Sequence, residues 1–296
     1  MANNAMHPVG TPLGANNNTN FGTDGVRGKA GTELTPALAL QLGYWSSHVL
    51  PRQGPVLLGK DSRQSGDMIT AALTAGLTAA GREVLLVDLC PTPAIPYLIK
   101  QTGAAGGFMV SASHNPPEDN GIKIFDEQGK KIDSAKQIFI ESKITGEEAS
   151  KHVQPTLRSF GKSYQRHELI KDYQESLLNS VAGKSLNGVS IVLDLCWGSA
   201  TACGAEVFAA LGADIKVLHG EPNGAKINVK CGSTQLDPLR KAVFECKAEM
   251  GFAFDGDADR MLAIDEKGRV IDGDHVLYLW GSTLKDRGEL PNNKLI

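Results

Sequence analysis

The chain of 296 residues is long enough for about two domains of ordinary size. It holds 30 Lys and Arg against 33 Asp and Glu, and its contents of 41% hydrophobic and 21% charged residues are typical of a soluble globular protein. These values exclude a disordered chain, a collagen-like repeat and a coiled coil, and a net charge of −3 argues against a broad nucleic-acid-binding surface. The 33 glycines exceed the usual share of about 7%, which indicates many tight loops.

The N-terminus carries no recognisable export signal. Residues 1–19 are rich in Asn and lack both a cationic start and an apolar core, so they predict a disordered N-terminal arm. No apolar run reaches the roughly 18 residues that cross a bilayer. The five cysteines are odd in number and contain no C-x-x-C pair, which is typical of a reducing compartment. We therefore expect a cytoplasmic protein without a membrane partner.

Strands and helices alternate through the first half of the chain. Thr35 and Pro36 predict the start of a helix that runs to Leu50. The elements predicted next are a strand at 55–59, a helix at 65–80 closed by Gly81, a strand at 83–89, a helix from Thr92-Pro93 and a strand at 108–110. This alternation indicates an α/β domain.

The pattern restarts after a polar stretch at 141–162, where we place a domain boundary. The predicted elements are then a helix ending near Val181, a strand at 190–195, a helix at 204–211, a strand at 214–218, a helix at 237–250 and a strand at 251–254. In each half an apolar strand leads into a polar cluster. Ligands of open α/β sheets bind at the carboxyl ends of strands, so both clusters are candidate sites.

The first cluster, residues 111–123, places Ser113 beside His114. A serine next to a histidine can act as a nucleophile, although a polar turn is the simpler alternative. The absence of a G-x-S-x-G motif argues against an ordinary acyl-transfer hydrolase. Lys123 lies in an alternating segment and, by that pattern alone, predicts a solvent-facing strand lysine.

The second cluster, residues 255–260, contains Asp255, Asp257 and Asp259. In an extended segment, residues two apart point the same way, so we expect these three carboxylates to converge. Converging carboxylates need a cation, and hard oxygen ligands suit Mg²⁺ or Ca²⁺. An EF-hand is excluded because Arg260 stands where its loop requires Gly, which leaves a solvated acidic turn as the alternative.

Two further loops supply cations. The glycine-rich segment 21–28 lacks the Walker lysine, but Arg27 is suited to a phosphate, or alternatively to a salt bridge with Asp24. Lys60 and Arg63 follow a predicted strand end. A serine, a tri-acidic loop and arginines at strand ends together form a phosphoryl-transfer set of nucleophile, metal site and charge clamps.

Four motifs in order resemble the α-D-phosphohexomutase superfamily: FGTDGVRG at 21–28, GKDSR at 59–63, SASHNP with DNGIK at 111–123, and DGDADR at 255–260. The segment 222–234 is most similar to the phosphoglucosamine mutase branch. The resemblance implies two consecutive three-layer α/β domains with mixed sheets. They span 20–160, which holds the phosphoserine loop, and 161–268, which holds the metal loop. Residues 269–296 then begin a third domain that the chain does not complete.

The same resemblance implies an isomerase that interconverts glucosamine 6-phosphate and glucosamine 1-phosphate. Ser113 would be carried as a phosphoserine and a sugar 1,6-bisphosphate would be the intermediate, with a phosphosugar as the small-molecule partner. One Mg²⁺ would be held by Ser113, Asp255, Asp257 and Asp259. The other implied site residues are Lys123 as acid/base, His114 and Arg27 as catalytic charge-organising groups, and Thr23, Arg27, Arg63, Asn115 and Arg260 as phosphate or substrate contacts.

One position departs from the motif, because Ala258 stands where this branch usually has Gly. Alanine resists left-handed backbone, so we expect ordinary dihedral angles there. Three alternatives remain open. They are a phosphomannomutase or phosphoglucomutase, a non-catalytic paralogue that binds Mg²⁺ or phosphate, and a phosphatase-like activity in which the phosphoserine loses its group to water.

Overall fold

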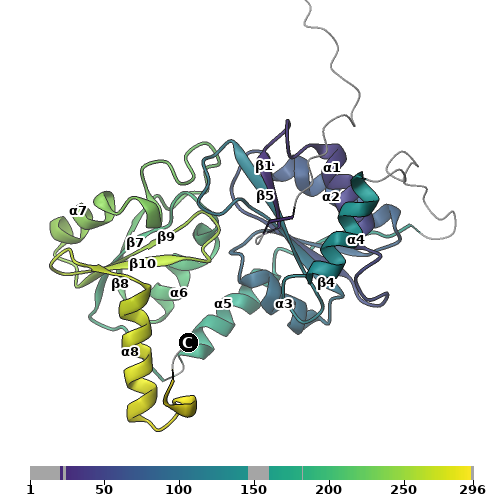
Figure 1. Cartoon of the computed structure of the whole chain (residues 1–296). Helices are drawn as coiled ribbons and strands as arrows, with labels where there is room; N and C mark the ends of the chain where they lie inside the picture. The colour runs from purple at the N-terminus through teal and green to yellow at the C-terminus, as the bar shows by residue number, and fades with distance from the viewer. Residues whose placement is uncertain (1–20, 23–24, 146–159, 182, 295–296) are drawn as a thin grey trace, which may run out of the picture.

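The computed structural model describes residues 21–22, 25–145, 160–181 and 183–294, which form two α/β units side by side (Figure 1). The arm expected at 1–19 and the expected phosphate contact Thr23 lie outside the described residues. Both units are layered, with helices covering a mixed sheet. The expected fold class is therefore confirmed.

The first unit is built on a six-stranded sheet. Its strands follow the order β1 (Val26–Lys29), β5 (Asp119–Phe125), β4 (Gly106–Val110), β2 (Val56–Lys60), β3 (Val84–Leu89) and β6 (Ser163–Gln165). The four strands from β4 to β6 run parallel, whereas β5 and β1 are antiparallel to their neighbours. The parallel strands therefore present their carboxyl ends, and the loops that follow them, at one edge of the sheet.

Helices cover both faces of this sheet because alternate strand residues point to opposite sides. Val56 and Leu58 pack with α1 (Pro36–Ser46), α2 (Gly66–Ala79) and α4 (Ser134–Thr145), whereas Leu57 packs with α3 (Ala94–Thr102) and α5 (Leu169–Ser180). Nearly continuous apolar runs such as the one in β2 are what a sheet covered on both faces requires.

The second unit is built on a five-stranded sheet. Its order is β11 (Val270–Ile271), β10 (Met261–Asp265), β9 (Met250–Phe254), β7 (Ser190–Asp194) and β8 (Asp214–Leu218), with β9, β7 and β8 parallel. Val192 packs with α7 (Asp237–Cys246) on one face. Leu193 packs on the other face with α6 (Gly204–Ala210) and the 3₁₀ turn η2 (Ser199–Ala202). Two further 3₁₀ turns are η3 (Gly232–Thr234) and η4 (Pro291–Asn293).

Most predicted elements are found within a residue or two, and the exceptions have local causes. Thr35 caps α1 by accepting the Leu38 amide, but the helix ends at Ser46, not Leu50. Helix α7 ends at Cys246 because Lys247 turns left-handed (φ +52°), which frees residues 250–254 for β9. Strand β6 pairs with β3, so the first sheet extends past the boundary expected at residue 160.

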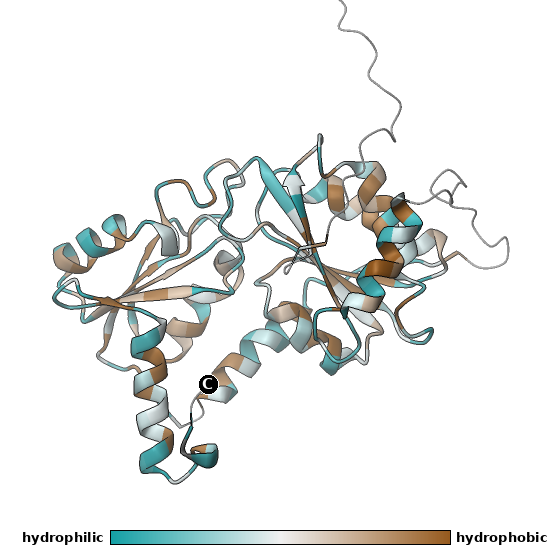
Figure 2. Cartoon of the chain, in the orientation of Figure 1, coloured by the Kyte–Doolittle hydropathy of each residue, from teal (hydrophilic) through white to brown (hydrophobic). Residues whose placement is uncertain are grey.

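The last α-helix of the described residues is α8 (Gly273–Asp286), which carries apolar as well as polar residues (Figure 2). Every residue of α8 is at least partly exposed, including five consecutive apolar ones: Val276, Leu277, Tyr278, Leu279 and Trp280. Within the described part of the chain, no helix combines the length and apolar character needed to span a membrane.

Candidate active site

The two polar clusters meet at the carboxyl ends of parallel strands. The loop that carries Ser113 follows β4, and the acidic loop at 255–260 follows β9. The Ser113 hydroxyl donates a hydrogen bond to Asp255 Oδ2 at 2.6 Å, which joins the two units at this point. Ser113 is only 2% exposed and its backbone is left-handed (φ +54°), a conformation that costs a non-glycine residue about 1–2 kcal/mol.

Arg63 organises the Ser113 loop from β2's carboxyl end. Its Nε pairs with Asp61 Oδ2 at 3.0 Å, and Nη2 donates to the carbonyls of Ser113 (2.9 Å) and Asn115 (2.8 Å). Nη1 donates to the carbonyls of Pro116 and Asp119. All five guanidinium N–H groups are thus used within the protein. Arg63 is therefore a buried support for the loop in this structure, and its contact with a phosphate stays a prediction.

The Asn115 side chain also acts within the loop, because its Nδ2 donates to Asp119 Oδ2 at 2.9 Å. The amide of Ser113 donates to Ser111 Oγ at 2.8 Å, and the Ser111 hydroxyl donates in turn to Asp61 at 2.7 Å. Burial raises the pKa of Asp61, although Arg63 and Ser111 oppose that rise. Hydrogen bonds therefore fix the serine loop through both its backbone carbonyls and the Ser113 amide.

The acidic loop brings three carboxylates together through a turn and not through an extended segment. Residues 256–259 are turn and bend, with Ala258 left-handed at φ +55°. The expectation of ordinary dihedral angles at Ala258 is therefore wrong, and so is the premise of an extended loop. One ligand oxygen each from Asp255, Asp257 and Asp259 nevertheless lies within 4.8 Å of the others. The turn therefore brings the three carboxylates together, as an extended segment with alternating side chains was expected to do.

Lys123 is 2% exposed, so the solvent-facing position expected from its alternating segment is wrong. Its Nζ donates to Asp257 Oδ2 at 2.6 Å and to Asp259 Oδ2 at 3.0 Å. Burial alone would lower the pKa of Lys123, but the attraction of these two carboxylates outweighs it and raises the pKa. Lys123 is thus held in its charged form inside the site.

The electrostatics of the carboxylates differ with their partners. Burial and the neighbouring Asp257 raise the pKa of Asp255 to about 6. Burial acts the same way on Asp257, but Lys123 and the Thr92 hydroxyl, which donates at 2.5 Å, hold its pKa below the ordinary value. Asp259 is 33% exposed. The group therefore combines two buried acids with one that reaches solvent.

An unsatisfied oxygen among the three aspartates indicates that they can bind a cation. Asp257 Oδ1 is buried and accepts no hydrogen bond from the described residues. A buried carboxylate oxygen without a donor is costly unless something satisfies it, and a hard divalent ion does so. Three carboxylates and the Ser113 oxygen fit Mg²⁺ or Ca²⁺.

Arg260 completes the charge balance around the serine. Its Nη2 donates to Asp255 Oδ2 at 2.9 Å and to Ser113 Oγ, and it contacts His114 Nδ1. The pKa of His114 is lowered, first by burial and then by the positive charges of Arg260 and Arg27. Arg27 lies on β1, paired with Gly121 of β5. The structure thus brings together every described site residue predicted from the sequence.

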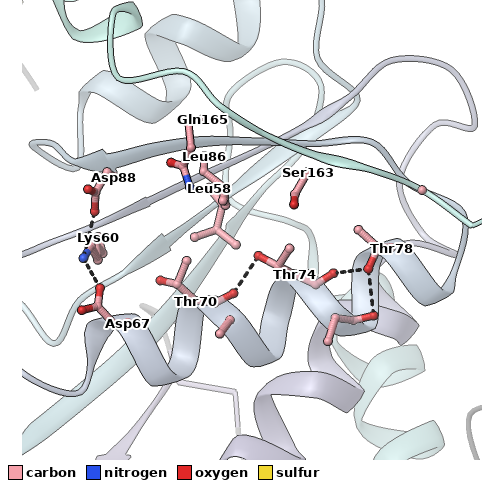
Figure 3. A pocket seen from close by; sticks show the side chains of 13 residues that line it. Leu58, Lys60, Asp67, Thr70, Thr74, Thr78, Leu86, Asp88, Ser163 and Gln165 are labelled. Atoms are coloured by element: carbon pink, nitrogen blue, oxygen red, sulfur yellow. Dashed lines mark hydrogen bonds and ion pairs between the residues drawn. The ribbon is translucent and has the colours of Figure 1, made fainter.

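A further cavity lies away from these residues. It measures about 600 Å³ and sits between α2 and strands β2, β3 and β6 (Figure 3). Lys60 at its edge pairs with Asp88 at 2.8 Å and with Asp67, and the hydroxyls of Thr74 and Thr78 bond along their own helix. None of the residues predicted for catalysis or metal binding lines it.

Comparison with known proteins identifies the family. Residues 18–151 match the model of phosphoglucomutase/phosphomannomutase alpha/beta/alpha domain I, and residues 171–268 match that of domain II. The chain belongs to this phosphohexomutase family. The resemblance recognised from the four motifs is confirmed.

The similar proteins are longer than this chain. A phosphoglucosamine mutase of Prochlorococcus marinus (strain MIT 9313) is 65% identical over 99% of this chain and 62% of its own length. One of Parasynechococcus marenigrum (strain WH8102) is 60% identical over 100% and 63%. A crystal structure of a phosphoglucomutase/phosphomannomutase family protein from Burkholderia thailandensis superposes with a TM-score of 0.77 at 26% identity, covering 89% of this chain and 58% of that one. The chain thus spans about 62% of the curated relatives' length.

Sequence reasoning missed three residues that shape this phosphohexomutase site. The sequence predicts a helix start at Thr92 and no contact with the acidic loop. Asp61 lies within the motif GKDSR and Asn228 within the segment 222–234, and neither is predicted to support the serine loop. Thr92 and Asp61 both follow strand ends, at the sheet edge where ligands are expected, and that position was the available signal. Asn228 lies in a loop with no comparable pattern.

Proposed function

We propose that this chain supplies the phosphoserine and metal-binding parts of a phosphoglucosamine mutase. The reaction interconverts glucosamine 6-phosphate and glucosamine 1-phosphate through a phosphorylated Ser113 and a sugar 1,6-bisphosphate. The observation that carries the proposal is the position of Ser113 Oγ, which contacts Asp255 on one side and Arg260 on the other. The relatives' shared name supports the sugar.

In this mechanism the chain's own residues bind the group and move protons. When a sugar bisphosphate donates, the bond between phosphorus and the sugar's ester oxygen breaks and the Ser113 Oγ–phosphorus bond forms, while the Ser113 hydroxyl proton passes to Asp255 Oδ2, which accepts its hydrogen bond. Lys123 gives a proton from Nζ to the sugar's ester oxygen, and Arg260 neutralises charge at Ser113 Oγ. Bound Mg²⁺, held by Asp255, Asp257 and Asp259, would neutralise the phosphoryl oxygens.

The domain assignment belongs to this proposal. We assign the phosphoserine domain to a segment that begins at residue 20 and ends near residue 165. The metal-loop domain follows it and ends at residue 268, and residues 269–296 begin a third domain. Strand β6 supports ending the first domain after Gln165 and not at 160. The five free cysteines, four of them buried, support a cytoplasmic, reducing location.

The test is phosphoryl loading of Ser113, measured by intact mass and peptide mapping after incubation with glucosamine 1,6-bisphosphate and Mg²⁺. We expect the 296-residue chain to gain one phosphoryl group at Ser113, and Ser113→Ala to gain none while keeping its circular dichroism spectrum. Ser142→Ala, which alters an exposed serine on α4, is the matched control and should load normally. Loading at another residue, or normal loading of Ser113→Ala, would contradict the assignment.

A further inference from the structure

Asn228 reaches from the second unit into the serine loop of the first. It lies between β8 and η3 and is half-buried, with left-handed backbone (φ +60°). Its Nδ2 donates to the carbonyl oxygens of Ser113 at 2.8 Å and Asn115 at 3.0 Å. These two carbonyls flank His114, so the contact fixes the backbone around the catalytic serine.

The same two carbonyl oxygens accept the hydrogen bonds from Arg63 Nη2. A carbonyl oxygen has two lone pairs, so each oxygen is saturated by one donor from Arg63 and one from Asn228. The arginine belongs to the first unit and the asparagine to the second. The left-handed conformation of Ser113 is therefore held from both units at once.

The orientation of the Asn228 amide is fixed by chemistry. Carbonyl oxygens only accept, so the NH₂ group must face them, and the amide oxygen then faces the Cys196 thiol, which donates at 3.2 Å between Sγ and Oδ1. The Cys231 thiol donates in turn to Cys196 Sγ at 3.8 Å. A one-directional chain of donors thus runs from Cys231 through Cys196 and Asn228 to the serine loop.

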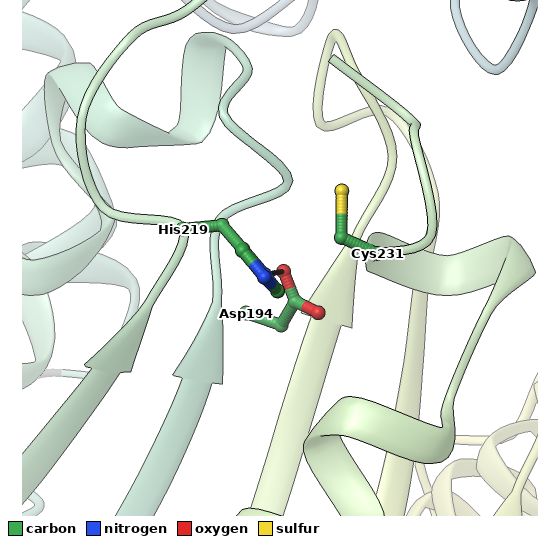
Figure 4. Close-up of side chains that lie close together, drawn as sticks. All are labelled: Asp194, His219 and Cys231. Carbon is green, nitrogen blue, oxygen red and sulfur yellow. Dashed lines mark hydrogen bonds and ion pairs between the residues drawn. The ribbon is translucent and has the colours of Figure 1, made fainter. Parts of the chain in front are cut away.

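Asp194 anchors this chain at the end of β7. Its Oδ1 accepts the Cys196 amide at 3.0 Å and its Oδ2 accepts the Gly232 amide at 2.9 Å, which fixes the backbone at Cys196 and beside Cys231. His219 Nδ1 lies 2.8 Å from Oδ1. The anchor is shown in Figure 4.

Asp194, His219 and Cys231 could by their spacing also hold a metal ion. Both oxygens of Asp194 are already engaged with backbone amides, however, and Oδ1 also lies 2.8 Å from His219 Nδ1. The cluster therefore serves the loop as a support.

We propose that Asn228 is a positioning residue for phosphoryl transfer, oriented by Cys196. The inference rests on the proposed role of Ser113 and adds that the second unit sets the position of that serine. Without the amide, one lone pair of each carbonyl loses its donor, and these two backbone carbonyls are held by Arg63 of the first unit alone. Misplacement of a reacting group by about 1 Å can cost on the order of 100-fold in rate.

The test compares the rate of Ser113 loading by glucosamine 1,6-bisphosphate in variants of the 296-residue chain. Asn228→Gly keeps the left-handed backbone and removes the amide, whereas Asn228→Asp keeps the shape and replaces the donor by an acceptor. We expect both to lower the maximal loading rate by about 10- to 100-fold. The bisphosphate concentration for half-maximal rate should stay unchanged, because Asn228 contacts the serine loop. Lys230→Gly, at an exposed left-handed residue (φ +53°) of the same loop, should load normally.

A second pair tests the orienting thiol and needs no change at Asn228. Cys196→Ala removes the donor to the amide oxygen and should slow loading, whereas Cys196→Ser keeps an O–H donor and should restore most of the rate. This pair decides the question if the Asn228 variants fail to fold.

Three results separate this inference from the function on which it rests. Failure of the unsubstituted chain to load Ser113 would overturn the proposed function, and the positioning role with it. Normal loading of the unsubstituted chain together with wild-type maximal rates in Asn228→Gly and Asn228→Asp would overturn only the positioning role. A raised half-maximal concentration at unchanged maximal rate would overturn it equally.

Discussion

Ala258 shows how one residue carries strain in the acidic loop. The turn from β9 to β10 holds it at φ +55°, where an L-residue other than glycine is disfavoured by about 1–2 kcal/mol. We expect Ala258→Gly to raise the free energy of unfolding by up to about 1 kcal/mol, since glycine's greater freedom in the unfolded chain offsets part of the relief. Urea denaturation measures the change.

The matched control is Ala209→Gly in α6, where the alanine is exposed and helical. There the same substitution should lower the free energy of unfolding by about 1 kcal/mol, because glycine disfavours helix. Equal destabilisation by both substitutions would contradict the strain at Ala258.

Residue types in the site were predictable from the sequence, but their partners were not. Ser113 and the three aspartates stand out because clustered carboxylates and a serine beside a histidine are chemically unusual. The contacts of Arg63 and Lys123, in contrast, join positions tens of residues or more apart, such as Lys123 and Asp257. A local sequence pattern carries no information on contacts between residues so far apart in the chain. The buried Lys123 therefore could not be distinguished from a solvent-exposed lysine in a strand.

At the scale of elements, β7 and β8 are tied at their carboxyl ends by Asp194 and His219. The hydrogen bond to Asp194 raises the pKa of His219 above its ordinary 6.5, with burial opposing. A raised pKa in the folded protein means that the stabilisation is fully present below pH 6.5 and is lost as the pH rises through the folded pKa. This contact therefore favours the folded state at mildly acidic pH.

We expect His219→Asn to lower the free energy of unfolding by on the order of 1 kcal/mol at about pH 6 and by less at about pH 9. Urea unfolding at both pH values measures the difference. His48→Asn, at an exposed histidine whose Nδ1 lies 3.0 Å from the Tyr44 carbonyl oxygen and not at a carboxylate, is the matched control. An equal loss at both pH values for His219→Asn would show that the ion pair adds nothing.

Buried parallel strands were the easiest elements to predict, because β2, β3 and β7 are short apolar runs between turn residues. The short strands β1, β6 and β11 were not predicted, since each is two to four residues long and gains its stability from a neighbouring strand. Strand order depends equally on tertiary packing, and only the resemblance to a family implied mixed sheets.

At the scale of the whole molecule, the two units meet through the loops at their strand ends. The Ser62 hydroxyl donates to the Trp197 carbonyl at 2.6 Å, and Thr92 of the first unit contacts Asp257 of the second through both side chain and backbone. The three clustered carboxylates repel one another at this junction, with Lys123 and Arg260 providing partial compensation. Neutralising them should therefore stabilise the arrangement of both units.

Mg²⁺ should accordingly stabilise the whole chain against unfolding. A ligand at 100 times its Kd that binds only the folded state adds about 2.7 kcal/mol, which calorimetry detects as a rise in Tm over an EDTA-treated sample. Asp259→Asn removes the most exposed of the three carboxylates and should abolish most of that rise while changing the Mg²⁺-free Tm little. Asp214→Asn, at an exposed aspartate in β8, should keep the full rise. An undiminished rise in Asp259→Asn would place the stabilising ion outside the acidic loop.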